Sequence, residues 1–234
     1  MSTKAAIHDV VTYIEQHIAE TYDLSNLPAV RDHLINSKEL ESSLGDQIPR
    51  DLARAGLVVN ETGKEAFVGI FLDDGLLQKL VEAPPMSELN HDNLDAFSVL
   101  VEEISHFMML ATRLSANRGV SRLEMELQGE MDKMLTAATL LQQQAGDPHV
   151  EHLTHIMFDR STVVSPWHRE TYNEANHVAG RFWHGIRRRM VGGGDREQIM
   201  TEVGQVMRQS YSATWDEKQR LMDLCARPSS RKAA

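Results

Sequence analysis

The sequence contains one cysteine, few aromatic residues and no long apolar run. Aromatic residues make up 6% of the chain against 12 methionines, which predicts a core whose gaps are filled by flexible thioethers. Because Cys225 stands alone, it cannot form an internal disulfide, so an oxidising compartment is not required. No apolar run approaches the ~20 residues of a membrane span, and Asp9 falls where a signal peptide needs its apolar segment. We therefore expect a cytoplasmic protein that does not bind a membrane.

Motifs for common enzyme chemistry are also missing from the sequence. Gly192–Gly194 follow a predicted helix rather than a strand, which does not fit a phosphate-binding loop. His149, His152 and His155 recur every three residues, but their angular spread on a helix would let at most two share an ion. We therefore assign no catalytic residue.

Charge is distributed unevenly along the chain, whose formal net charge is −10. Residues 160–234 carry 13 Lys and Arg against 8 Asp and Glu, a net charge of +5, which leaves −15 for residues 1–159. Such asymmetry is typical of a surface that meets an oppositely charged partner, or of contacts between the two parts of one molecule.

Residues 1–83 predict a small α+β unit. Apolar residues recur at helical spacing over 7–18 and 27–34, and Pro49 can begin a third short helix. Two β-rich runs flank Gly63, which predicts a hairpin. The order of three helices and a hairpin, with the stretch LARAGLVVNETGKEAFVGIFL, resembles a winged helix. That resemblance implies DNA binding, but residues 1–75 carry 6 Lys and Arg against 13 Asp and Glu, which favours docking on a protein instead.

Residues 92–226 predict a helical bundle, separated from the first unit by a linker at 84–91. A tail at 227–234 lacks apolar anchors and is expected to be disordered. Apolar periodicity and capping signals predict five helices in this part. The first spans about 92–116, and the second runs from Ser121 to Gly146 with a capping box at Ser121 and Glu124. A short third helix follows Asp147-Pro148, a fourth runs from Ser165-Pro166 to Gly192, and a fifth from Asp195 to about Ala226.

Glu-x-x-His pairs raise the question of a metal site, because such pairs on bundle helices can hold two ions. Three occur, at Glu88/His91, Glu103/His106 and Glu174/His177, against roughly one expected by chance. Glu174 and His177 fall opposite the apolar side of their helix, so we expect them to face away from the core.

Two glutamates break the apolar pattern of the helices over 92–116 and 121–146. Glu103 lies at the edge of one apolar face and Glu130 inside the other, whereas His106 shares a polar stripe with Glu102 and is expected to face outward. A buried carboxylate must be paired, hydrogen-bonded, metal-bound or protonated. The interpretations are a structural salt-bridge network, a protein interface, or a metal or acid/base site. The candidate metal ligands are Glu103, His106, Glu126 and Glu130.

The densest positive patch follows the polar face of the helix that ends near Gly192. The candidate partner-binding residues on it are His177, Arg181, His184, Arg187 and Arg188. This face could be solvated, pair with the acidic part of the chain, bind an acidic protein or bind phosphate. Glu170 and Glu174 on the same face weaken the nucleic-acid interpretation, because each cancels a phosphate contact.

We interpret the chain as a mainly α, non-catalytic protein-binding subunit or adaptor of a bacterial-type cytoplasmic assembly. It would have a protein partner, could form a homo-oligomer and would use no cofactor. The first alternative is a helical-bundle protein that binds a divalent metal ion through carboxylates and histidine, with oxidoreductase chemistry as one use. The second is a nucleic-acid-associated protein that uses the basic helix face, which is disfavoured but left open.

Overall fold

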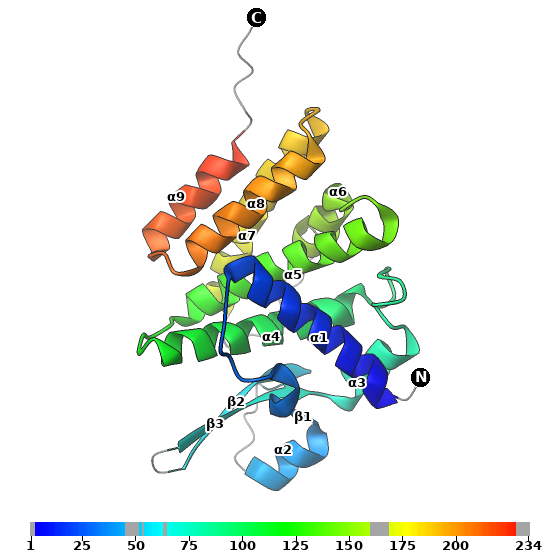
Figure 1. Ribbon diagram of the computed structural model, residues 1–234, viewed down its shortest axis with the longest axis vertical. Coiled ribbons are helices and arrows are strands. Elements are labelled where there is room, and N and C mark those ends of the chain that lie inside the picture. The colour runs from blue at the N-terminus through cyan, green and yellow to red at the C-terminus, as the bar shows by residue number, and fades with distance from the viewer. Residues whose placement is uncertain (1–2, 45–51, 53, 63–64, 160–168, 228–234) are drawn as a thin grey trace, which may run out of the picture.

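The computed structural model describes residues 3–44, 52, 54–62, 65–159 and 169–227, and these form a mainly helical protein with a small sheet (Figure 1). The α-helices are α1 (Thr3–Tyr22), α2 (Ser37–Leu44), α3 (Asp74–Glu82), α4 (Leu94–Ser115), α5 (Arg122–Ala145), α6 (Val150–Thr154), α7 (Arg169–Val191), α8 (Arg196–Tyr211) and α9 (Trp215–Ala226). A 3₁₀-helix, η1 (Val30–His33), precedes the sheet, and a π-helix, η3 (His155–Asp159), follows α6. The strands are β1 (Leu34–Ile35), β2 (Ala55–Thr62) and β3 (Glu65–Leu72).

The sheet has the order β1-β3-β2, with helices on both of its faces. The predicted hairpin is confirmed, since β2 pairs antiparallel with β3 from Ala55↔Leu72 to Thr62↔Glu65, while β1 pairs parallel with β3. Successive residues of a strand point to opposite faces. Accordingly, Ile70 belongs to the large core on the side of α4, whereas the neighbouring Phe71 joins a small cluster with Leu40 of α2.

The winged-helix-like arrangement is not confirmed. The segment predicted as a second helix forms η1 and then β1, and a helix that the sequence pattern did not predict, α2, follows it. The helix predicted to begin at Pro49 and the turn residue Gly63 lie outside the described residues. Gly56, a few residues further along the chain, lies in β2.

Helices α4 and α5 form the centre of the molecule (Figure 1). On one side α4 meets α1, α3 and the sheet, and on the other it packs along α5, so its middle is buried nearly all round. One cluster of buried apolar residues extends from α1, through Ile14 and Ile18, to Phe97 in α4 and Leu127 in α5. The division into domains at residues 83 and 92 stays a prediction. The linker segment itself is attached to the bundle, because the Gln144 side chain accepts a hydrogen bond from Leu89 N and donates one to Pro85 O.

The predicted helix boundaries of α5 are confirmed by their caps. Ser121 Oγ accepts a hydrogen bond from Glu124 N at 3.2 Å, and Glu124 Oε2 accepts one from Ser121 N at 3.0 Å, which completes the capping box. At the other end Gly146 adopts a left-handed conformation with φ of 74°, which glycine tolerates without steric cost.

The C-terminal prediction of one helix from Asp195 to Ala226 is wrong. The segment forms two helices, α8 and α9, because Thr214 and Glu217 make a second capping box that starts α9. Helix α9 lies close to α7 at Gly185, where a side-chain carbon would lie 2.4 Å from Ala226 Cβ. Helix α8 returns to the first helix, since the Arg208 guanidinium donates hydrogen bonds to the carbonyls of Thr21 and Glu20 at 2.8 and 2.9 Å.

Two further expectations concern the ends of the chain and the membrane. The tail predicted to be disordered, residues 227–234, lies outside the described residues except for Arg227. None of the described helices combines the length and apolar character needed to cross a bilayer.

Candidate functional site

The polar stripe of α4 does not face outward as predicted; it is buried against α5. Ser105 and His106 are buried, and Glu102 is only partly exposed. The expectation failed because α4 is covered on all sides: its apolar stripe meets α1 and the sheet, and its polar stripe meets polar residues of α5. Two groups of polar side chains result, one around His106 and one around Asp132.

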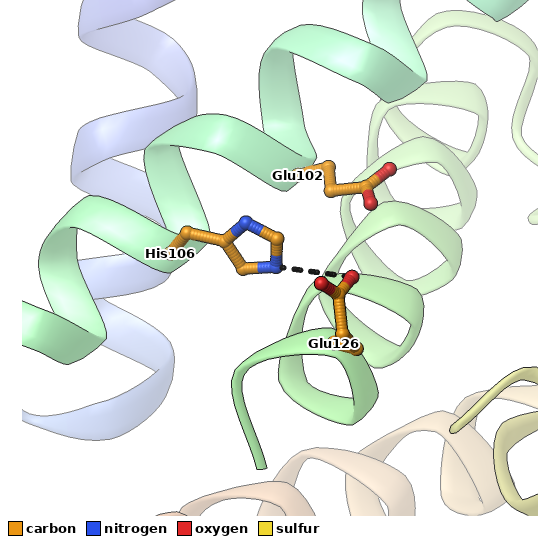
Figure 2. A group of neighbouring side chains, drawn as sticks. All are labelled: Glu102, His106 and Glu126. Atoms are coloured by element: carbon orange, nitrogen blue, oxygen red, sulfur yellow. Dashed lines mark ion pairs between the residues drawn. The ribbon is translucent and has the colours of Figure 1, made fainter. Parts of the chain in front are cut away.

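Three side chains of the first group converge between the two helices (Figure 2). Glu102 and His106 lie one turn apart on α4, and Glu126 lies on α5. One possible ligand atom from each of the three lies within 4.8 Å of the other two. His106 Nε2 points toward Glu126, with Nε2 and Oε2 3.9 Å apart (Figure 2). We refer to these residues as the Glu102–His106–Glu126 triad.

The His106 ring presents an unused nitrogen to this triad. The His106 side chain is only 8% exposed, and Nε2 has no hydrogen-bond partner among the described residues. A buried polar atom without a partner costs free energy, so such atoms are rare in folded proteins and call for an explanation. An unpartnered imidazole nitrogen and two neighbouring carboxylates together form a donor set of the kind found in metal sites.

Gly129 of α5 makes room for the ring. A Cβ atom at this position would lie 2.9 Å from His106 Nε2 and 3.1 Å from Glu102 Cγ. Glycine in the interior of a helix is unfavourable by roughly 1 kcal/mol relative to alanine. The close approach of His106 and Glu102 to the α5 backbone therefore depends on a residue that local helix stability disfavours.

The other ring nitrogen of His106 faces Glu103. Nδ1 lies 3.8 Å from Glu103 Oε2, and both side chains are nearly buried. A carboxylate on the second nitrogen of a histidine orients the ring and leaves the first nitrogen available to a ligand. Glu103, predicted as a ligand, thus lies behind His106 rather than inside the triad.

Glu130, also predicted as a ligand, pairs with a buried lysine. Lys133 Nζ donates to Glu130 Oε1 at 2.7 Å and to Glu102 Oε2 at 2.9 Å, and it lies 3.5 Å from the Tyr172 hydroxyl of α7. We call the triad, together with the three residues around it, the carboxylate–histidine cluster. Its members are Glu102, Glu103, His106, Glu126, Glu130 and Lys133.

Burial and charge act against each other in this cluster. Burial lowers the pKa of His106, but the carboxylates of Glu103, Glu126 and Glu102 outweigh it and raise that pKa to about 9. Burial raises the pKa of both Glu103 and Glu130. It also acts to raise the pKa of Glu102, where the positive charges of Lys133 and His106 prevail and lower it. The cluster is therefore rich in carboxylates whose ionised forms need a cation.

The sequence and the geometry agree on some candidate ligands and differ on others. His106 and Glu126 were predicted and lie in the triad, whereas Glu103 and Glu130 were predicted and flank it. Glu102 was assigned to an outward stripe and was not among the predicted ligands. Its spacing of four residues from His106, which puts both on one face of a helix, is the signal that could have found it.

The second group of buried polar residues, the Asp132 network, joins α1, α4 and α5. The Asp132 carboxylate accepts hydrogen bonds from the Tyr22 hydroxyl, from Ser105 Oγ at 2.6 Å and from Gln128 Nε2 at 3.1 Å. Gln128 Nε2 also donates to the Tyr22 hydroxyl at 2.7 Å. Each of the four side chains has at least one partner within the network.

The basic face of α7 points outward, as predicted. The exposed side chains on this face are those of Glu174, His177, Arg181 and Arg188. The second Glu-x-x-His pair, Glu174 and His177, is therefore not part of a buried site. His184 is less accessible, because its Nε2 lies 3.2 Å from Asp159 Oδ1. Arg187 is half-buried. Binding of a partner to this face stays a prediction.

An apolar groove of about 350 Å³ lies where α4 meets the sheet. Leu114 at the end of α4 is 59% exposed and Phe67 of β3 is 48% exposed, both high values for large apolar side chains. His33 stacks on Phe67 and lies tilted against Phe107. The lining of the groove includes His33, Phe107, Leu27, Pro28 and Leu110. Exposed apolar surface of this kind is a feature of contact sites.

Comparisons of the chain with protein-family models, with curated proteins and with solved structures found no match. No function can therefore be transferred from a relative, and the function has to be inferred from the side chains described above.

Proposed function

We propose that the chain binds one divalent transition-metal ion between α4 and α5, with Glu102, His106 and Glu126 as its ligands. The observation that carries this proposal is His106 Nε2, a buried imidazole nitrogen without a hydrogen-bond partner among the described residues, directed at a carboxylate. Ligand atoms of one tetrahedral ion lie about 3.4 Å apart, given metal–ligand distances near 2.1 Å. The candidate ligand atoms of the triad lie within 4.8 Å of one another, so ion binding would require the side chains to move closer together.

The formal charge of the cluster supports a divalent cation. Its four glutamates carry four negative charges when ionised, and Lys133 carries one positive charge, while His106 has to be neutral to bind an ion through Nε2. Three formal negative charges then remain in a region with little access to water. A divalent ion would offset two of them, and Arg122, half exposed beside Glu126, marks the more accessible side of the triad.

The donor set favours first-row transition metals over Mg²⁺ or Ca²⁺. Imidazole suits zinc, iron and copper, whereas magnesium and calcium prefer oxygen ligands alone. Three protein ligands leave a coordination position open, which is the arrangement of catalytic rather than structural zinc sites. Affinity is expected to rise from Mn²⁺ through Fe²⁺ to Zn²⁺.

Metal analysis of protein purified without a histidine tag tests the proposal. After incubation with Zn²⁺ and dialysis we expect about one ion per chain, and less than about 0.1 would reject the site. Glu126→Gln should weaken Zn²⁺ binding by at least about 10-fold, because the amide is a poorer ligand than the carboxylate. The matched control is the double variant Glu174→Gln, His177→Gln, which alters the exposed Glu-x-x-His pair and should bind like wild type.

Thermal unfolding gives an independent readout. Zn²⁺ at about 100 times its Kd should stabilise the folded state by about 2.7 kcal/mol. The shift should be absent from His106→Gln and retained by the Glu174→Gln, His177→Gln control. An equal shift in His106→Gln would place the bound ion elsewhere.

A protein-binding function is a second candidate, supported by the apolar groove beside Leu114. A partner that covers the groove would bury Leu114, which is otherwise exposed to water. Leu114→Glu should abolish the recovery of such a partner from the native host, whereas Val191→Glu, at a 68% exposed site outside the groove, should not. Equal recovery with both variants would exclude the groove.

The basic face of α7 offers a separate test of charged partners. Changing Arg181 and Arg188 to Glu should remove binding of an acidic protein or of nucleic acid, and only the latter should weaken steeply with salt. If neither class binds wild-type protein at low salt, the exposed face is solvated.

A further inference from the structure

We propose that the Lys133 ammonium occupies the position of a second metal ion, and that it thereby limits the site to one ion per chain. This inference rests on the metal binding proposed above and adds to it the number of ions. Helical bundles rich in inward-facing glutamates can hold two ions about 3.5–4 Å apart, joined by carboxylates that contact both. The carboxylate–histidine cluster has the glutamates for such a pair, but a lysine lies among them.

The position of Glu102 between two groups carries the inference. Glu102 contributes to the triad with His106 and Glu126, and its Oε2 also accepts a hydrogen bond from Lys133 Nζ at 2.9 Å. Glu130 accepts the next hydrogen bond from the same ammonium at 2.7 Å. Glu102 therefore belongs to the triad and also accepts a hydrogen bond from Lys133, as a bridging carboxylate contacts two ions.

The ammonium has acceptors for all of its donors. An ammonium has three N–H groups, and the acceptors around Lys133 Nζ are Glu102, Glu130 and, at 3.5 Å, the Tyr172 hydroxyl. Lys133 is buried, and its Nζ lies within hydrogen-bond distance of both the Glu102 and the Glu130 carboxylates. A second cation could therefore not share these two carboxylates with the ammonium.

The position of Lys133 also explains why Glu130 lies outside the triad. Glu130 is 2% exposed and held by Lys133, so its carboxylate is not available to an ion bound by His106. Removing the ammonium would release both Glu130 and the Oε2 atom of Glu102. These two oxygens, with the Tyr172 hydroxyl nearby, would then form a second oxygen-rich position next to the first ion.

Manganese titration of Lys133→Ala tests the inference. Wild-type protein should bind one Mn²⁺ and show the electron paramagnetic resonance spectrum of an isolated ion. Lys133→Ala should bind two, with the altered spectrum of a magnetically coupled pair. Adding Glu130→Gln to Lys133→Ala removes a ligand of the second position and should restore one ion. Lys218→Ala, which removes another buried lysine outside the cluster, should keep one ion.

The outcomes separate this inference from the proposed function. Wild-type protein that binds no metal would reject the proposed site and the inference together. One ion in wild type and one isolated ion in folded Lys133→Ala would reject only the role of Lys133. If circular dichroism shows that Lys133→Ala does not fold, wild-type protein in excess Mn²⁺ decides: an isolated-ion spectrum supports the inference, and a coupled pair overturns it.

Discussion

Two groups of polar side chains lie between α4 and α5. They differ in how completely their hydrogen-bonding groups and charges are paired within the group. In the Asp132 network each side chain meets a complementary donor or acceptor, and the network ties Tyr22 of α1 to the central pair. In the carboxylate–histidine cluster, carboxylates outnumber cations, and His106 Nε2 has no hydrogen-bond partner among the described residues. Most side chains of both groups are buried, so burial alone does not distinguish them.

The difference separates a group that stabilises the fold from a group suited to a ligand. A satisfied buried network favours one arrangement of the helices, and removing a member leaves its partners unpaired. A group with excess charge and an unpaired donor or acceptor is costly by itself and becomes favourable only when something binds. Variants in the two groups should therefore affect different measurements.

Asp132→Ala should have the largest effect, on stability alone. It leaves Tyr22, Ser105 and Gln128 without their common acceptor in a buried region, and we expect a loss of about 3 kcal/mol in the free energy of unfolding. Urea denaturation measures it. Asp132→Asn, which keeps one acceptor oxygen, should lose less. If both variants unfold like wild type, the network does not stabilise the protein.

Lys218→Met sharpens the comparison, because Lys218 is a buried group near Asp132 without a hydrogen-bond partner among the described residues. Its side chain is 2% exposed, and burial lowers its pKa from 10.5 to about 8, although Glu124 acts to raise it. The folded protein thus binds the proton of Lys218 less tightly than the unfolded chain does. The free energy of unfolding of the wild type therefore falls as the pH drops from 10.5, the unfolded pKa, toward 8.

At pH 7 the replacement should therefore raise the free energy of unfolding by about 2 kcal/mol. The gain should shrink as pH rises from 8 to above 10. Lys79→Met, at an exposed site on α3, is the control and should change little. A gain that is independent of pH would mean that packing, and not charge, is responsible.

Glu103→Gln should act on metal binding with little effect on stability. Glu103 faces His106 Nδ1, and loss of such a supporting carboxylate weakens metal affinity by about 10-fold or more. Because burial raises its pKa, Glu103 gains little from being ionised in the fold. Calorimetric titration with Zn²⁺ measures the affinity, and an unchanged Kd would remove Glu103 from the site.

Gly129→Ala should have the smallest effect on stability and still impair binding. The added methyl would lie 2.9 Å from His106 Nε2, but alanine favours the helix by about 1 kcal/mol, so the two effects should nearly cancel in unfolding. Gly204→Ala in α8, where nothing lies within 4 Å, should stabilise without altering Zn²⁺ affinity. Equal affinities in the two variants would show that His106 Nε2 is not a ligand.

Much of the helical fold could be predicted from the sequence because it follows local rules. The apolar stripe of α1, the apolar face of α7 and the capping box of α5 depend on residues within a few turns of one another. The missed break between α8 and α9 was also local, since Thr214 and Glu217 have the spacing of a capping box. The unpredicted α2 and the short β1 depend on contacts with β3, which is distant in sequence.

The candidate site could be predicted only in part, for a different reason. Glu103 and Glu130 interrupt apolar faces, so their burial was visible in the pattern. A polar stripe, in contrast, indicates which residues share a face and not what covers that face. Glu102 and His106 were assigned to solvent because the pattern of α4 contains no information about Gly129 and Lys133 on the opposing helix.

The contact of Arg208 with the end of α1 has a consequence for the order of events during translation. Thr21 and Arg208 are separated by 187 residues, and Tyr22 stacks on Tyr211, so α1 leaves the ribosome long before these partners exist. At 5–20 residues per second the delay is roughly 10 to 40 seconds. For that time the apolar stripe of the nascent first helix lacks the part of its covering that α8 supplies in the folded protein.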